Sequence, residues 1–125
     1  MWMDAPSSED LRILIRGFLK DFKGSMAENK YEVKGNHKKN LDTLIQLGIT
    51  TIQRDDVIRQ LKVEDYCSGP FEDEYKPKDS LWVFGKTIDE HEIYIKLKID
   101  LNRNQAICLS FHISEYPMRY PFKRN

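Results

Sequence analysis

Apolar and polar residues alternate strictly over three segments in the last third of the chain. The apolar positions that recur at every second residue are Trp82 and Phe84, then Ile93, Ile95, Leu97 and Ile99, and then Ile107, Leu109 and Phe111. A period of two is typical of strands that bury one face. We therefore predict three antiparallel strands within residues 81–113, followed by a basic, aromatic and proline-containing tail up to residue 123.

Two predicted turns set the register of these strands. A turn near residues 89–90 gives two opposite pairs, Phe84 with Ile95 and Trp82 with Leu97, and a second turn lies within residues 100–104, where Asn and Arg supply turn chemistry. We place Ile107, Leu109 and Phe111 on the apolar face, because a slip of one residue would move all three to the other side. Ser110 then lies across from Tyr94. The opposite face is predicted to hold Tyr94, Lys96, Lys98, Cys108, Ser110 and His112, with Val83 and Gly85 across from Lys96 and Tyr94.

Helical spacing dominates the first half of the chain. After Met1–Pro6, which we expect to be a loose start, Ser7 and the acids that follow indicate a helix N-terminus. The apolar stripe of this helix is Leu11, Leu14, Ile15, Phe18, Leu19 and Phe22, and the helix is predicted to end near Lys23-Gly24. The stripe is predicted to pack on the sheet, and binding of a partner protein is the alternative.

Two further helices are predicted before the sheet. One covers about residues 36–47 and stops at Gly48. Thr50-Thr51 opens the other, which covers about residues 54–61, with Val57, Ile58 and Leu61 inward. Residues 31–33 are predicted to form a short edge strand. The chain is thus expected to have an α+β fold, in which N-terminal helices pack on one face of an antiparallel β-sheet.

Residues 63–79 are predicted to be a connecting loop, because Ser68-Gly69-Pro70 and Lys76-Pro77-Lys78 both interrupt regular structure. Residues 64–79 contain six acids against two bases. A long loop in a small domain is often functional or mobile, so a solvated loop and a loop that flanks a site both stay open. The whole chain, residues 1–125, is expected to be one domain, with a helical part at about 7–62 and the sheet and tail at 80–125.

The charges balance, with 20 Lys and Arg against 20 Asp and Glu, which argues against a globally basic nucleic-acid binder. Residues 80–125 are mildly basic, with seven bases against five acids. Cys67 and Cys108 are far apart and lack zinc-ligand spacing, and the acids at 72–74 have no histidine partner at ligand spacing, so we expect no metal and two reduced thiols. No apolar run is long enough to span a membrane, and the first residues lack the basic and apolar regions of a signal peptide. We therefore expect a cytoplasmic protein.

Several short runs occur in a characteristic order: LKVEDY at 61–66, SGP at 68–70, LWVFGK at 81–86, IYIK at 93–96, CLSFH at 108–112 and YPM at 116–118. In this order and spacing they resemble the MqsR-like branch of bacterial type II toxins, which are small proteins with a RelE-like fold. The resemblance covers residues 61–123, about half of the chain. It implies a metal-independent endoribonuclease without a cofactor, which cleaves messenger RNA and is held inactive by a cognate antitoxin protein.

The same resemblance suggests where the site lies. A Tyr-x-Lys strand contributes to the site of such toxins, and Tyr94 and Lys96 stand there in this chain. The preceding strand has a catalytic glutamine in the best-known member, and the aligned residue here is Val83, so that part of the mechanism does not transfer. A non-catalytic RNA- or protein-binding module that keeps the fold is therefore the alternative function.

Metal-free RNA cleavage needs proton transfer at the 2′-hydroxyl and at the leaving 5′-oxygen, together with cations near the phosphate. Histidine suits the proton transfer, and lysine or arginine suits the charge. We assign His112 as general acid or base, Lys96 as a phosphate stabiliser and Tyr94 as a proton-transfer or orienting group. The residues assigned to RNA binding are Lys98, Ser110, Arg119, Tyr120 and Lys123, with Arg119 also a candidate phosphate stabiliser and Arg124 a further basic residue. Tyr116 and Met118 are expected to pack the tail down, and His37 and His91 to be incidental.

Overall fold

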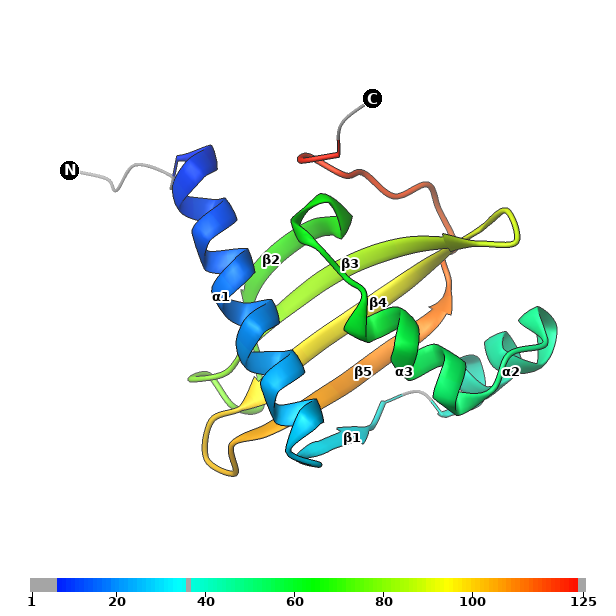
Figure 1. Cartoon of the computed structure of the whole chain (residues 1–125), viewed down its shortest axis with the longest axis horizontal. Coiled ribbons are helices and arrows are strands. Elements are labelled where there is room, and N and C mark those ends of the chain that lie inside the picture. The colour runs from blue at the N-terminus through cyan, green and yellow to red at the C-terminus, as the bar shows by residue number, and fades with distance from the viewer. Residues whose placement is uncertain (1–6, 36, 124–125) are drawn as a thin grey trace.

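The computed structural model describes residues 7–35 and 37–123 and has an α+β fold. Its elements are α1 (Ser8–Ala27), β1 (Tyr31–Val33), α2 (His37–Leu47), α3 (Thr51–Arg59), the short 3-10 helix η1 (Val63–Asp65), β2 (Tyr66–Glu72), β3 (Ser80–Ile88), β4 (His91–Asp100) and β5 (Gln105–Ile113). The strands form one sheet in the order β1-β5-β4-β3-β2. Figure 1 shows α1 crossing one face of this sheet, with α3 on the same side and α2 beside the end of β5.

Helix α1 begins as its sequence predicts and ends later. The Ser7 hydroxyl accepts the backbone N–H of Asp10 at 3.1 Å, which caps the helix. The helix continues through Gly24 to Ala27, because a glycine inside a helix costs only about 1 kcal/mol. Its buried residues are Ile15, Leu19, Phe22 and Met26. Within the described residues, no helix combines the length and the apolar character that crossing a bilayer requires.

Helix α3 begins at Thr51, where Thr50-Thr51 was predicted to open it, and ends at Arg59 instead of at about residue 61. Thr50 and Gln53 form a capping box, in which the Thr50 hydroxyl accepts the Gln53 N–H at 3.1 Å and the Gln53 side chain accepts the Thr50 N–H at 2.8 Å. This pair fixes the first turn of the helix. The expected start of α2 at Asn36, the loose start at Met1–Pro6 and Arg124 all lie outside the described residues.

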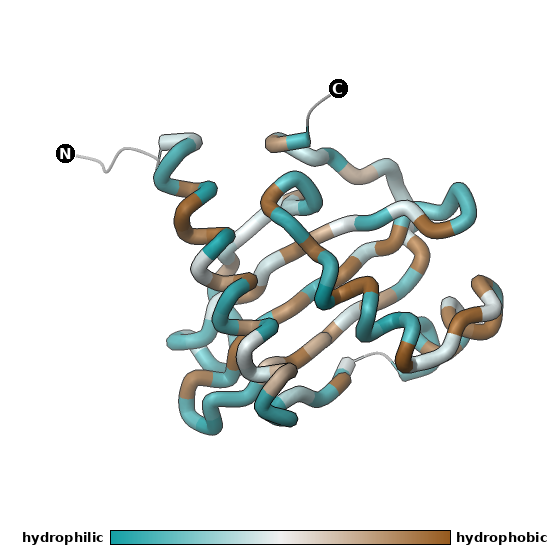
Figure 2. Tube along the Cα trace, in the orientation of Figure 1, coloured by the Kyte–Doolittle hydropathy of each residue, from teal (hydrophilic) through white to brown (hydrophobic). Residues whose placement is uncertain are grey.

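The predicted apolar face of β3 and β4 is confirmed as the core. The hydrophobic cluster joins Trp82, Phe84, Ile93, Ile95 and Leu97 to the buried stripe of α1. It also includes Leu44 from α2, Ile58 from α3 and Leu61, which follows α3. Phe18 stacks on Trp82, with ring centroids 5.2 Å apart. In Figure 2, apolar positions alternate with paler and polar ones along the strands.

The β3–β4 hairpin has the predicted register. Phe84 pairs with Ile95 and Trp82 with Leu97, while Val83 pairs with Lys96 and Gly85 with Tyr94 on the other face. The turn residues Asp89 and Glu90 have φ of 48° and 69°. Positive φ at both central positions is typical of the type I′ turn, whose twist suits an antiparallel hairpin.

The predicted register of β5 is wrong along the whole strand, although Phe111 and His112 lie on the faces predicted for them. Lys96 pairs with Ser110 and Leu97 with Cys108, so Leu109 is an extra residue in a β-bulge. Cys108 therefore lies in the core instead of on the polar face, and Ile107 pairs with Lys98 on the polar side. His112, rather than Ser110, lies across from Tyr94. Ser110 and His112 are thus shifted by two residues, which keeps each on its predicted face. A regular period of two contains no signal for a bulge and does not exclude a shift of two residues, and this is why the prediction failed.

The sheet contains one parallel pair of strands, whereas an antiparallel sheet was predicted. The expected short strand at residues 31–33 exists, but β1 pairs parallel to β5, with Glu32 opposite Ile107. Past the residues of β5 that pair with β1, side chains of α2 accept hydrogen bonds from the backbone of β5. The Asn40 side-chain oxygen accepts the Phe111 N–H, and the Thr43 hydroxyl accepts the Ile113 N–H, both at 3.1 Å. The long connection from β1 through the remaining elements to β5 makes parallel pairing possible.

The prediction of a loop at residues 63–79 is also wrong. This segment contains η1 and the edge strand β2, which pairs with β3 through two register shifts. Gly69 and Pro70 interrupt regular structure in most contexts, but an edge strand tolerates both at bulges. The short connection that remains, residues 73–79, is held by buried Asp73 and Asp79.

Candidate functional site

The polar face of the sheet gathers all three residues assigned to catalysis. Tyr94, Lys96 and His112 line one hollow of about 220 Å³, together with Ser110. Strand pairing explains this, because Tyr94 lies opposite His112 and Lys96 opposite Ser110 on neighbouring strands. The remaining wall comes from the start of the tail and from α2, and its residues are Lys39, Ser114, Glu115 and Tyr116.

His112 is held in a defined orientation. Its ring stacks on that of Tyr94, with centroids 5.3 Å apart and planes 16° apart, and its Nδ1 lies 3.1 Å from the backbone oxygen of Ile113. A carbonyl oxygen can only accept, so the proton of the neutral ring belongs on Nδ1. Nε2 then holds the lone pair that a general base requires.

Tyr94 remains a phenol at neutral pH. Burial, with smaller contributions from Tyr116 and Cys67, raises the pKa of its hydroxyl above the ordinary value. A protonated phenol can both donate to a phosphate oxygen and accept, whereas a phenolate can only accept. The ring also forms the flat surface on which His112 stacks.

Lys96 provides the positive charge at the centre of this face. Within residues 7–35 and 37–123, no carboxylate lies within ion-pair distance of its ammonium. Lys39, at the rim of the hollow, is paired with Glu115 at 2.6 Å. Lys96 is therefore able to meet an anionic ligand without first leaving an ion pair.

A second hollow of about 560 Å³ adjoins the first and shares Tyr94, Lys96 and Tyr116 with it. Its other lining residues are Cys67, Ser68, Phe71, Leu81, Val83, Pro117, Met118 and Arg119. Arg119, which was predicted to bind RNA, thus lines the same hollow as Tyr94 and Lys96. Tyr116 was expected to pack the tail, but it is 64% exposed and forms a wall between the hollows.

Several lining residues were missed by the sequence prediction. Leu81 has the same parity as Val83 on β3, so the strand alternation already contained the signal for it. Phe71 could not be found, because β2 was predicted as loop. Lys39 comes from a helix that the sequence assigned only to the opposite face.

Lys98 does not have the exposed position that RNA binding requires. Its side chain is buried, and its ammonium donates to Asp73 at 2.7 Å and to Asp79 at 3.1 Å. Burial lowers the pKa of Lys98, but the hydrogen bonds and the negative charges of Asp73 and Asp79 together raise it by more, so the pKa lies above its ordinary value. We therefore remove Lys98 from the RNA-binding set and assign it to the structure of the 73–79 connection.

Tyr120 and Lys123 lie beyond the two hollows, where the tail crosses the sheet. The Tyr120 hydroxyl donates to Glu92 at 3.1 Å, and the Lys123 ammonium lies 5.2 Å from the centre of the Tyr120 ring. Gly85 makes this crossing possible, because a Cβ there would lie 2.5 Å from the Tyr120 hydroxyl. The two residues anchor the tail and do not contact the His112 hollow.

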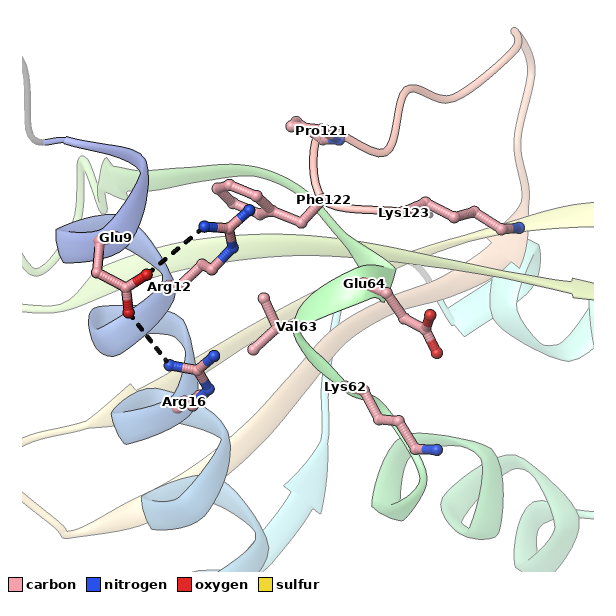
Figure 3. A pocket seen from close by; sticks show the side chains of 9 residues that line it. All are labelled: Glu9, Arg12, Arg16, Lys62, Val63, Glu64, Pro121, Phe122 and Lys123. Carbon is pink, nitrogen blue, oxygen red and sulfur yellow. Dashed lines mark ion pairs between the residues drawn. The ribbon is translucent and has the colours of Figure 1, made fainter. Parts of the chain in front are cut away.

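The largest hollow, about 600 Å³, lies where the tail meets α1 and η1, and Figure 3 shows its lining. The Arg12 guanidinium lies 4.7 Å above the Phe122 ring, and Glu9 pairs with Arg12 and Arg16 at 3.6 and 3.9 Å. None of the residues assigned to catalysis reaches it. Arg12 contacts the tail through Phe122 and Arg16 is paired with Glu9, so we place the candidate site at the polar face instead.

No group of three or more His, Cys, Asp or Glu residues that could hold a metal ion occurs among the described residues. Cys67 and Cys108 are free thiols, and burial raises the pKa of each to about 12. Comparison of this chain with models of protein families, with curated proteins and with solved structures found no match.

Proposed function

We propose that this chain is a metal-independent endoribonuclease with a RelE-like fold, the toxin of a type II toxin–antitoxin system that cleaves messenger RNA in the cytoplasm. The observation that supports the proposal most is the stacked pair of His112 and Tyr94 beside the Lys96 ammonium, which has no ion-pair partner among the described residues. These groups supply a base, a proton donor and a cation within one hollow. They are the three functions that cleavage through a 2′-hydroxyl needs.

In the proposed reaction, Nε2 of His112 takes the proton of the 2′-hydroxyl as the 2′-oxygen attacks the adjacent phosphorus. The Lys96 ammonium stabilises the negative charge that develops on the phosphate oxygens. Tyr94 orients the imidazole by stacking, and its phenol donates a proton to the leaving 5′-oxygen. The products are a 2′,3′-cyclic phosphate and a 5′-hydroxyl end.

The assignment is tested by cleavage of an end-labelled RNA with purified variants. His112→Ala is expected to cut about 100- to 10,000-fold more slowly, which is the usual contribution of general acid–base catalysis. His91→Ala is the matched control, since His91 lies in the β3–β4 hairpin, away from both hollows. A folded His112→Ala variant that cleaves at the wild-type rate would contradict the mechanism.

One observation favours a second candidate, a non-catalytic RNA- or protein-binding module. Val83, the residue aligned with the glutamine of the resembled toxins, is buried and apolar, with 4% of its surface exposed. It cannot supply a polar group to the reaction. Wild-type protein that binds single-stranded RNA tightly and never cleaves it would favour this second function.

The antitoxin partner belongs to the first proposal and has its own test. Expression of the chain alone should arrest bacterial growth, and co-expression of a neighbouring gene should restore it. The His112→Ala variant should not arrest growth. Arrest by that variant would mean that toxicity does not depend on the proposed chemistry.

A further inference from the structure

The larger hollow on the polar face has an unusual lining for an exposed sheet surface. Leu81, Val83 and Met118 form an apolar floor and side, and two exposed aromatic side chains, Phe71 and Tyr116, stand at its edges. Phe71 is 50% exposed and Tyr116 is 64% exposed. Large exposed aromatic side chains around an apolar hollow are typical of a binding surface.

Strand order explains why this hollow adjoins the proposed catalytic groups. Ser68 on β2 pairs with Val83 on β3, and Val83 pairs with Lys96 on β4, so one row of residues crosses the sheet from the edge to the His112 hollow. Neighbouring strands are about 4.8 Å apart, which puts the floor at Val83 about 5 Å from the backbone of Lys96. A ligand with a phosphate at Lys96 would therefore extend its next group over Val83.

Polar groups at the rim are available to a ligand. Within the described part of the chain, neither the Ser68 hydroxyl nor the Arg119 guanidinium has a side-chain partner in a hydrogen bond or an ion pair. A guanidinium can pair with a phosphate or with the edge of a base, and a hydroxyl can donate or accept. The hollow thus combines apolar walls, aromatic edges and a few unpaired polar groups.

We infer that this hollow, formed by Ser68, Phe71, Leu81, Val83, Met118 and Arg119, binds the nucleobase next to the scissile phosphate of a single-stranded RNA and so sets which sequence is cut. Phe71 stacks on the base, Val83 lies beneath it, and Ser68 and Arg119 contact its polar edge or the flanking phosphate. The position of this base next to a cleaved phosphate rests on the proposed function, whereas binding of the base itself can be tested separately. Val83 then has a role that a glutamine would not fill, because it closes the apolar floor.

Binding is measured by fluorescence anisotropy with four single-stranded heptamers of 2′-fluoro RNA, each of one base composition. These probes lack the 2′-hydroxyl nucleophile and cannot be cleaved by the proposed reaction. Wild-type protein should prefer one composition. Phe71→Ala should weaken that preferred probe about 5- to 150-fold and level the differences among the four, since stacking of a base on an aromatic side chain has this magnitude.

Three further variants separate stacking from charge and from general loss of structure. Phe71→Trp should keep the preference, because it keeps a stacking surface. Tyr75→Ala removes an 86% exposed aromatic side chain just after β2, outside both hollows, and should change nothing. Lys96→Ala should weaken all four probes by a similar factor, as a phosphate contact does.

Equal binding of the four probes by wild-type protein, or a Phe71→Ala variant that keeps the wild-type preference, would overturn the inference. The outcome for the ribonuclease is read independently, from the ends that wild type and Phe71→Ala produce on a long natural RNA. Cleavage with an unaltered sequence pattern in Phe71→Ala would refute the base pocket and leave the ribonuclease standing. Phe71-dependent base preference without any cleavage would support the pocket and refute the ribonuclease.

Discussion

Two lysines on the polar side of β4, only two residues apart, are expected to respond to substitution in opposite ways. Lys98 is 6% exposed, and its ammonium lies 2.7 Å from Asp73 and 3.1 Å from Asp79, both of which are buried. Lys96 is half-buried and faces the hollow. We predict that Lys98→Met destabilises the fold, while Lys96→Met lowers activity and leaves stability nearly unchanged.

The magnitude follows from these distances. At an effective dielectric constant of about 20, a charge pair at 2.7 Å contributes about 6 kcal/mol of attraction and one at 3.1 Å about 5 kcal/mol. Desolvation of three buried charges offsets most of this sum. Methionine keeps the length of the side chain but leaves two buried carboxylates without a cation, and loss of one partner of a buried pair costs about 3–5 kcal/mol. The Lys96→Met change should stay within about 0.5 kcal/mol.

The measurement is urea unfolding at pH 7, followed by far-ultraviolet circular dichroism, with both variants and the wild type. The expected result is a lower midpoint for Lys98→Met with an unchanged slope, which reports a change in stability and not in the unfolded state. A loss below about 1 kcal/mol would refute the buried ion cluster. Lys98 would then return to the list of residues open to RNA.

Three further outcomes are expected. Hydrogen bonds from Lys98 and Lys76 hold the pKa values of Asp73 and Asp100 below the ordinary range. The stability that these two carboxylates contribute is therefore present above about pH 4 and is lost as the pH falls through their lower folded-state pKa values. Thermal unfolding from pH 7 to pH 2 should show this loss, and the difference in stability between wild type and Lys98→Met should become smaller toward acid pH. Gly35 has φ of 101°, and a Cβ there would lie 2.0 Å from the Leu109 oxygen, so Gly35→Ala should lower the free energy of unfolding by about 2 kcal/mol or more, with Gly17→Ala, where nothing lies within 4 Å, as the control that does not. Asn40→Ala should cost about 1–3 kcal/mol in the same urea assay, because the buried Phe111 N–H loses its acceptor, and a neutral result would mean that water replaces it.

The sequence predicted those parts of the fold in which local pattern and tertiary structure agree. The alternation in β3 and β4 and the turn at Asp89 predicted the correct pairs, because a core on one face excludes a shift of one residue and the tight turn excludes larger shifts. The bulge at Leu109 escaped prediction, since the alternating pattern contains no signal for an extra residue. Strand β2 escaped because Pro70 is tolerated only at an edge, and sequence does not state which strand is at the edge.

Some residues of the candidate site could likewise be predicted from the sequence, and others could not. Tyr94, Lys96 and His112 were predicted to share one face, and the structure places them in one hollow despite the error in β5, because the bulge lies on the far side of Ser110. The fate of Lys98 could not be predicted, since its carboxylate partners follow a strand that was missed. Phe71 and the exposed position of Tyr116 likewise depend on the path of β2 and of the tail.

We propose metal-free cleavage of RNA at the face formed by His112 and Lys96. Its most direct test is the chemistry of the ends that purified protein leaves on a labelled RNA in excess EDTA, beside a substrate with a single 2′-deoxyribose at the cleaved position. We expect 2′,3′-cyclic phosphate ends, resistance to EDTA, and no cleavage at the deoxy position or by His112→Ala and Lys96→Ala. Cleavage that stops in EDTA, or that continues at the deoxy position, would contradict it.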